Sequence, residues 1–273
     1  DDDDEELAQF EDDTDSFMLR KREFLFAGLP PVVLSQDFVS VEGTGGAVWR
    51  PSVQFGKFVC GPKGRRSLPL AGKSVLEISS GLGLGAIVAW HLGASPVVAT
   101  DIASENGPIT LLSRNVTANC GGTAAFSASL VGAEGGLVVA ATDGDEFDWK
   151  SGVIGRGKRE THSRPPYVQE LCWGNEVQLA EALVRFKGFG PDVVLACDVI
   201  FDDALLAPLS ETLVEACRLR TKEGTRPSLC ISHQRRNKKR EDRFFCDLAG
   251  LLGGGEWREV HREDDLSVFL MVW

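Results

Sequence analysis

The stretch SVLEISSGLGLGAIVAW, residues 74–90, decides the fold. An apolar run reaches Glu77, a turn of serines and alternating glycines follows, and a second apolar run with helical character begins. This order predicts a buried strand, a tight turn and the start of a helix. Gly81, Gly83 and Ala86 satisfy the G-x-G-x-x-[G/A] pattern of nucleotide-binding turns. The stretch therefore predicts an α/β fold that binds a nucleotide at the end of its first core strand.

The acidic residues on either side of the glycines bear on which nucleotide is bound. Asp101 ends the next predicted strand, SPVVATD, where an acid suits the ribose hydroxyls of a dinucleotide. The glycines and Asp101 are also compatible with a dinucleotide site, or with a glycine-rich turn that binds no ligand. Glu77 favours S-adenosylmethionine (AdoMet), because its charge would repel a pyrophosphate and attract the cationic amine of the methionine part.

The rest of the chain alternates strands with helices. Strands are predicted at 72–79, 95–101, 167–174, 191–201 and 227–233, with helices at 53–59, 84–94, 107–122, 176–186, 205–220 and 240–252. This alternation builds a mostly parallel sheet covered by helices on both faces. Residues 257–273 predict two strands around an Asp264-Asp265 turn. A nicotinamide-binding domain usually ends with a parallel strand, so a closing antiparallel hairpin disfavours it.

Charge divides the chain unevenly. Residues 1–15 contain ten acidic groups and no basic one, so the remainder carries 29 positive against 30 negative groups (40 minus 10). We expect residues 1–20 to be an acidic, disordered tail, with docking of a basic partner as the alternative. Residues 21–273 would form the main domain, with an N-terminal hairpin at 24–48 and an insertion at 121–168.

Composition predicts a cytoplasmic protein, with the nucleus as a second location. The N-terminus is acidic where a secretory leader would be basic and apolar, and no apolar run approaches a membrane span. The seven cysteines are scattered without a C-x-x-C pair, which is typical of reduced core thiols. The four histidines show no metal-ligand spacing, so no metal is expected. We expect a monomer that does not bind membranes.

Four stretches together carry a resemblance to a known family. They are GTGGAVWRPS, VLEISSGLGLGAIVA with ATD, ELCWG and DVVLACDVIF, and they cover the chain from about residue 24 to its end, except for the insertion. In this order they resemble the seven-β-strand protein-lysine methyltransferases that act on non-histone targets. The resemblance implies a Rossmann-like, class I methyltransferase sheet of seven strands, mostly parallel, with an antiparallel C-terminal strand and helices on both faces. It also implies AdoMet as cofactor and a lysine side chain of a protein substrate as methyl acceptor.

The resemblance assigns roles to individual residues. Cofactor contacts are implied for Trp49, Glu77, Ser79, Gly81, Gly83, Asp101, Trp173 and Cys197, and catalytic positions at the acceptor channel for Asp198 and Phe201. Trp49 would pack beside the cofactor, although a tryptophan there also suits a core. Ser79 departs from the family's glycine, and Phe201 lacks a phenolic hydroxyl. Asn115 and Asn119 are expected to be structural caps.

Other functions remain open from the sequence. A different acceptor, histidine or a small molecule, keeps the cofactor, but the N-P-P-[YF] motif of enzymes that methylate amide or base nitrogens is absent. A catalytically silent binding module and a nicotinamide oxidoreductase are alternatives from other classes. The basic run HQRRNKKR, residues 233–240, follows the fifth core strand. We interpret it as a solvated helix start or a docking site for an acidic protein. Nucleic acid is the weakest reading, because the main domain is not basic.

Overall fold

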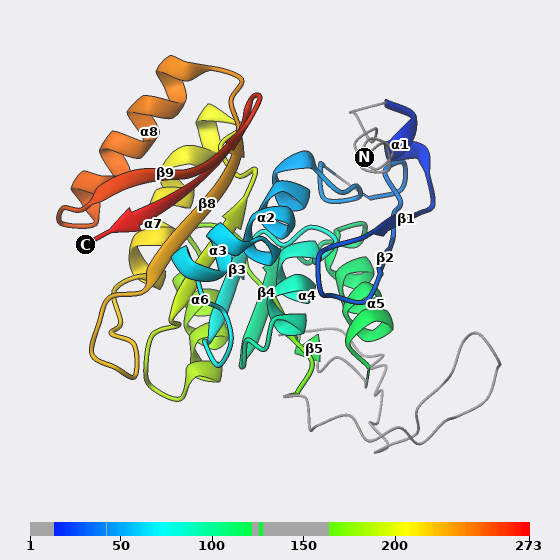
Figure 1. Cartoon of the computed structure of the whole chain (residues 1–273), viewed down its shortest axis with the longest axis horizontal. Helices are drawn as coiled ribbons and strands as arrows, with labels where there is room; N and C mark the ends of the chain where they lie inside the picture. The colour runs from blue at the N-terminus through cyan, green and yellow to red at the C-terminus, as the bar shows by residue number, and fades with distance from the viewer. Residues whose placement is uncertain (1–13, 42, 122–125, 128–163) are drawn as a thin grey trace.

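A mostly parallel sheet forms the centre of the computed structural model, which describes residues 14–41, 43–121, 126–127 and 164–273 (Figure 1). The described part of this sheet has the strand order β5-β6-β4-β3-β7-β8-β10-β9. The strands are β3 (Val75–Ile78), β4 (Val97–Asp101), β5 (Phe126–Ser127), β6 (Tyr167–Glu170), β7 (Val193–Cys197), β8 (Ser228–Gln234), β9 (Glu256–Glu263) and β10 (Leu266–Val272). Apart from the two-residue β5, the sheet has seven strands.

The closing hairpin of the sheet is antiparallel, as predicted. β10 pairs antiparallel with both β8 and β9, whereas β6, β4, β3, β7 and β8 pair in parallel. Because β9 is reversed relative to β10, it runs in the same direction as the parallel strands, and β10 is the reversed strand. This is the class I methyltransferase arrangement, which confirms the predicted fold class.

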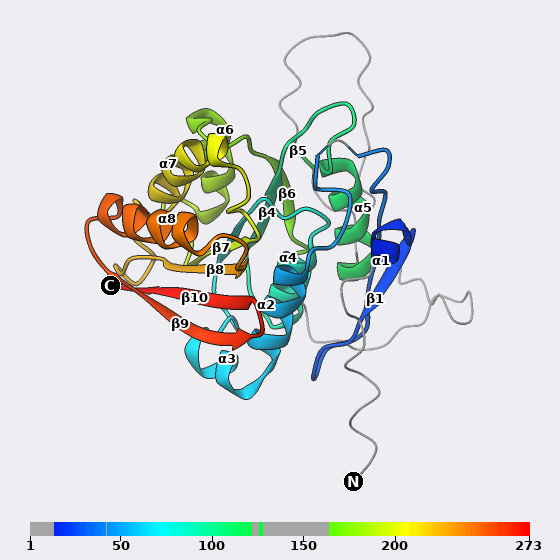
Figure 2. The ribbon, with the colours of Figure 1, turned by 90° about the horizontal axis from the view of Figure 1, so that it is seen from above.

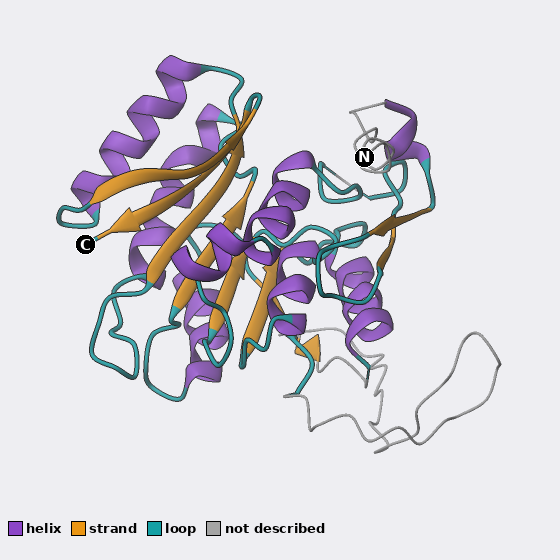
Figure 3. Cartoon of the chain, viewed as in Figure 1, coloured by secondary structure: helices purple, strands orange, loops and turns teal. Residues whose placement is uncertain are grey.

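Two layers of helices cover the sheet, one on each face (Figures 2 and 3). The helices are α2 (Arg50–Cys60), α3 (Pro62–Ser67), α4 (Leu84–His91), α5 (Ile109–Cys120), α6 (Glu176–Leu183), α7 (Leu206–Ala216) and α8 (Lys238–Leu251), with the short 3-10 turns η1 (Val184–Phe186) and η2 (Asp203–Leu205). Helices α2, α4 and α5 pack on one face, and α6, α7 and α8 pack on the other.

Alternation along the central strands divides the core between these layers. Val75 and Val193 belong to the cluster under α2, α4 and α5, and their neighbours Leu76 and Val194 belong to the cluster under α6, α7 and α8. Successive side chains of a strand point to opposite faces, so a strand covered on both faces must be apolar throughout. The continuous apolar runs in the sequence have this cause.

The N-terminal hairpin differs from its predicted position. It consists of β1 (Lys21–Phe24) and β2 (Val32–Ser35), so it begins before residue 24 and its pairing ends well before residue 48. Residues 14–20 of the tail expected to be disordered are described, whereas residues 1–13 lie outside the described residues. Residues 14–18 form the helix α1 (Thr14–Met18), and the Phe17 ring stacks on Phe38 and lies 4.9 Å from Trp49. These ring contacts hold α1 against the loop that carries Phe38 and Trp49.

Two asparagines of α5 fasten the hairpin to the main domain. The Asn115 amide accepts from the Ser35 backbone N–H at 2.8 Å and donates to the Ser35 carbonyl at 3.1 Å. Asn119 makes the same pair of bonds with Val33, at 2.9 and 2.8 Å. The prediction that both are helix caps is wrong, because their amides satisfy the free edge of β2.

The predicted insertion lies mostly outside the described residues. Of residues 121–168, the structure describes Gly121, the short strand β5 and residues 164–168, which lead into β6 and begin it. Within the part of the chain that is described, no helix is long and apolar enough to cross a bilayer.

Candidate functional site

A cavity of about 600 Å³ opens at the carboxyl ends of the parallel strands. Ligands of open α/β sheets bind at this edge, because the turns that follow the strands meet there. Eight of the residues singled out from the sequence line it: Trp49, Ser79, Gly81, Asp101, Trp173, Cys197, Asp198 and Phe201. The other two, Glu77 and Gly83, lie beneath its surface.

The glycine turn forms the floor of the cavity. The Ser80 N–H donates to the Thr100 carbonyl at 2.7 Å, and the Gly83 N–H donates to the Ser80 carbonyl at 2.8 Å. Ser79, Gly81 and Gly83 have φ values of 55°, 53° and 89°. Glycine adopts this left-handed backbone without strain, whereas a serine does so at a cost. Ser79 therefore keeps the turn that a glycine would make.

Glu77 acts inside the fold rather than at the cavity wall. Its side chain is buried, and its Oε2 accepts the Ala86 backbone N–H at 2.8 Å in the first turn of α4. Burial raises the pKa of this carboxyl to about 8, against the lowering effect of its hydrogen bonds with Ser80 and Ala86. Glu77 thus holds the helix start in place and does not line the cavity, so the structure does not place it at the cofactor contact that the resemblance implies.

Gly83 is also a packing position. A Cβ added there would lie 2.6 Å from the Leu112 Cδ1, and its positive φ disfavours any other residue. Glycine at this position therefore lets α4 and α5 approach each other.

Asp101 presents a fixed carboxylate to the cavity. Its Oδ2 accepts the Gly81 N–H at 2.7 Å and its Oδ1 accepts the Ile102 N–H at 2.8 Å. Burial raises its pKa to about 6, although both hydrogen bonds act in the opposite direction. Each carboxylate oxygen can accept a second hydrogen bond, so Asp101 can bind a pair of hydroxyl groups.

Aromatic rings form the walls. The Trp49 indole N–H donates to the Thr44 carbonyl at 2.7 Å, and this bond holds the ring at the cavity. The rings of Trp173 and Phe201 also line the cavity, and their centroids lie 6.1 Å apart. The walls are therefore flat, apolar surfaces that suit a planar heterocycle or an alkyl chain.

Asp198 is a second acidic residue that lines the cavity. It follows β7, has a φ of 56°, and donates its backbone N–H to the Ser232 carbonyl at 2.8 Å. Its side chain is only 7% exposed. Both oxygens are bound by the guanidinium of Arg236, each at 2.7 Å, in a bidentate pair.

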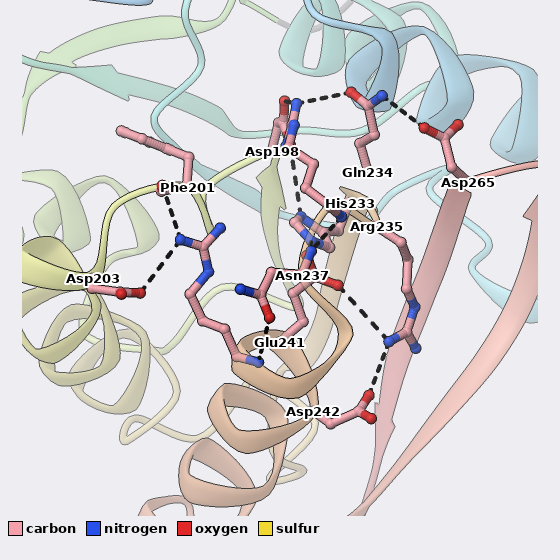
Figure 4. Close-up of polar contacts among 12 residues, drawn as sticks. Asp198, Phe201, Asp203, His233, Gln234, Arg235, Asn237, Glu241, Asp242 and Asp265 are labelled. Atoms are coloured by element: carbon pink, nitrogen blue, oxygen red, sulfur yellow. Dashed lines mark hydrogen bonds and ion pairs between the residues drawn. The ribbon is translucent and has the colours of Figure 1, made fainter.

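Arg236 is a charged residue of the cavity that the sequence analysis did not assign to the site. It lies in the basic run interpreted as a solvated helix start or a docking surface, yet its side chain lines the cavity. One signal was available: the run begins in the last two residues of β8, and the carboxyl ends of parallel strands meet at one edge. The contacts in this part of the molecule are shown in Figure 4.

A buried histidine lies behind this pair. His233 is fully buried, with its Nδ1 3.7 Å from the Asp198 Oδ1 and its Nε2 3.2 Å from the Glu241 Oε1. Burial lowers its pKa, against the raising effect of both carboxylates, so the imidazole is neutral near pH 7. Cys197, just before Asp198, borders the cavity, and burial raises the pKa of its thiol well above the usual value. Within the described residues, no group of three His, Cys, Asp or Glu side chains is placed to hold a metal ion.

Comparison with known proteins supports the fold alone. No family model matches the sequence, and no curated protein matches it significantly. The structure is similar to a protein assigned as a SAM-dependent methyltransferase from Streptococcus mutans, with 12% identity and a TM-score of 0.52 over 93% of this chain and 56% of that one. The SAM-dependent methyltransferase from Agrobacterium tumefaciens has 12% identity and a TM-score of 0.50, over 93% and 70%. A further structure assigned as a methyltransferase, complexed with SAH, has 11% identity and a TM-score of 0.50, over 93% and 56%.

Proposed function

We propose that this protein is an AdoMet-dependent methyltransferase that modifies a lysine side chain of a non-histone protein. The observation that carries the proposal is one cavity with a fixed carboxylate at each end, Asp101 beside the glycine turn and Asp198 among aromatic walls. The fold and the SAH complexed with a similar structure are consistent with it.

The cavity fits AdoMet at the Asp101 end. Asp101 would accept hydrogen bonds from the ribose hydroxyls, and Gly81, with only the Gly45 carbonyl near the position of an added Cβ, lets a ligand approach the backbone. Trp49 and Trp173 would lie against the flat or apolar parts of the cofactor. When bound, AdoMet supplies a sulfonium methyl group that is ready for transfer.

The chain's own residues would align the acceptor and exclude water. A lysine amine must be neutral to attack, and deprotonation near pH 7 costs about 4.6 kcal/mol for an amine with a pKa of roughly 10.4. Burial between Trp173 and Phe201 lowers that cost, because an apolar channel disfavours the charged form. An oxygen of Asp198 would accept an N–H of the amine and orient its lone pair. Asp198 is thus an orienting acceptor rather than a strong base.

The proposal extends to the protein's setting. We infer a monomer, because the described cavity is lined by residues of a single chain. The scattered cysteines of the sequence favour the cytoplasm, with the nucleus as a second location.

Labelled AdoMet tests the function directly. Purified protein is incubated with cell extract and labelled AdoMet, and labelled bands are analysed by mass spectrometry. We expect methyl-lysine in the wild-type sample and none with Asp198→Ala, which should keep its affinity for AdoMet. Asp247→Asn, on the exposed side of α8, serves as a matched control and should behave as wild type. Label on histidine would instead support the other acceptor.

Calorimetry separates the remaining alternatives. Binding of AdoMet without methyl transfer would indicate a silent binding module, and binding of NAD in its place would indicate an oxidoreductase.

A further inference from the structure

Arg236 cancels the charge of the carboxylate that faces the acceptor. Its guanidinium forms two parallel bonds with Asp198, and both residues line the same cavity. Asp198 alone would be a buried anion, and a buried anion attracts a cation and raises its pKa. Because the two residues are paired, a methyl acceptor beside Asp198 meets the positive guanidinium of Arg236 next to the negative carboxylate.

Several contacts hold Arg236 in this position. Its NH2 also donates to the Gln234 Oε1 at 2.8 Å, and its backbone N–H donates to the Glu241 Oε1 at 2.8 Å. The Gln234 amide in turn donates to Asp265 at 2.7 Å, in the turn between β9 and β10. The side chain of Arg236 is about one third exposed, at 34%, so it reaches the cavity from the rim.

The other charges near Arg236 have partners of their own. Asp265 pairs with Arg50 of α2 at 3.3 Å, and Arg235 pairs with Asp242 of α8 at 2.9 Å. Glu241 accepts two backbone N–H groups at the start of α8, those of residues 236 and 237. The neutral His233 separates Glu241 from the Asp198 carboxylate. The Asp198–Arg236 pair therefore sets the local charge that an acceptor meets.

We propose that Arg236 is a specificity-determining residue that makes the acceptor site bind an uncharged amine and exclude an ammonium ion. The inference rests on the proposed function and names the protonation state of its acceptor. An ammonium group beside Asp198 would also lie near the guanidinium, and a neighbouring cation lowers the pKa of an amine. A neutral amine avoids this repulsion, and each oxygen of Asp198 keeps a lone pair that can accept its N–H. The site thus selects the form with a free lone pair.

The test measures binding and needs no turnover. The probe is n-butylamine, which has the length and nitrogen of a lysine side chain, titrated into protein saturated with S-adenosylhomocysteine at pH 7, 8 and 9. If only the neutral form binds, the apparent affinity rises about tenfold per pH unit, because the neutral fraction does so below an amine pKa of roughly 10.4. We expect this slope for the wild type.

Variants that change the charge at positions 198 and 236 then test whether Arg236 causes the dependence of butylamine affinity on pH. With Arg236→Gln, Asp198 is left alone and holds the ammonium form, so the affinity becomes nearly independent of pH. Arg236→Lys restores the cation, and the double variant Asp198→Asn with Arg236→Gln removes both charges, so both should regain the tenfold slope. Arg243→Gln, with a side chain 84% exposed on α8, is the matched control and should match the wild type. Thermal unfolding checks that each variant is folded.

Each outcome decides the proposal. A wild-type affinity that does not change with pH, or an Arg236→Gln variant that keeps the tenfold slope, overturns the role of Arg236. If Arg236→Gln does not fold, Arg236→Met removes the same charge and is measured in its place, and a flat wild-type profile overturns the role without any variant. Failure to bind S-adenosylhomocysteine would overturn the proposed cofactor, and this inference with it. Cofactor binding with a flat wild-type profile would overturn this inference alone.

Discussion

The carboxyl group of Glu77 occupies the space that a Cβ on Gly85 would need. A Cβ built there would overlap the Glu77 Oε1 and lie 3.0 Å from Leu195 Cδ2. The first turn of α4 can thus approach the end of β3 only with glycine at this position, and Glu77 fills the remaining gap while accepting the Ala86 N–H.

Gly85→Ala is expected to destabilise the protein by about 1–3 kcal/mol, because the added methyl overpacks a closed core. Gly250→Ala is the matched control, since Gly250 also lies in a helix but has no atom within 4 Å of an added Cβ. It should gain about 0.5–1 kcal/mol from helix propensity. Urea unfolding of both variants checks the pair, and equal effects would contradict the role of Glu77 as the obstacle.

Glu77 should make stability fall as pH rises. Its pKa is about 8 in the native protein and near 4.5 in the unfolded chain. The native state therefore keeps a proton that the unfolded chain loses, so the contribution is complete below pH 4.5 and is lost as pH rises to about 8.

We expect the free energy of unfolding to decline over this range, by at most about 1.4 kcal/mol per pH unit from this group. Glu77→Gln should flatten the decline, and Glu256→Gln, whose side chain is 75% exposed, should not. The pKa of Asp101 is also raised, but this residue is present in the wild type and in both variants, so the difference between their pH curves reports on Glu77. Urea unfolding at pH 5 to 9 provides the measurement, and parallel curves for all three would rule out a buried proton on Glu77.

Asp101→Asn is expected to weaken AdoMet binding about 10- to 100-fold, because hydrogen bonds to a charged acceptor contribute about 1.5–3 kcal/mol. Wild-type affinity should also fall as pH drops through about 6, where this carboxyl takes up a proton. The variant should show no such fall. Calorimetric titration between pH 5 and 8 checks both statements, and an unchanged affinity in the variant would remove Asp101 from the cofactor site.

Asn115 and Asn119 should differ in their contribution to stability. Asn115 is buried and makes three hydrogen bonds, two to Ser35 and one to the Leu82 carbonyl. Asn115→Ala leaves these groups unpaired and should cost about 2–3 kcal/mol, whereas Asn119→Ala, near solvent, should cost about 1 kcal/mol or less. Thermal unfolding compares them, and limited proteolysis should show β2 released first in Asn115→Ala. Equal losses would show that burial does not set the difference.

The parallel core could be predicted from sequence because both of its faces are covered. Val75, Leu76, Val193 and Val194 must all be apolar for that reason, and such runs are visible without a structure. The hairpin bounds were less accurate, since β2 is completed by amide groups of α5, whose residues lie far along the chain. Nothing local in the sequence marks that contact.

In the candidate site, too, residues within one local motif could be predicted, whereas contacts between distant parts of the chain could not. The residues of the glycine turn and Asp101 lie close together in the chain, and their motif is local. The Asp198–Arg236 pair joins the ends of β7 and β8, and depends on strand adjacency and on one side-chain conformation among many. The basic run shows that Arg236 is charged but not where its side chain points. The sequence therefore favoured a solvated position for a residue that lines the cavity.

The strand order also divides the cavity between two separate parts of the chain. The Gly81–Asp101 bond is supported by β3 and β4, while Asp198 and Arg236 follow β7 and β8 on the other side of β3. Mutations after β7 and β8 can thus remodel one half and leave the hydrogen bonds of the other intact. A protein built this way can acquire a new target during evolution, or by engineering, while the half that contains Asp101 is inherited unchanged.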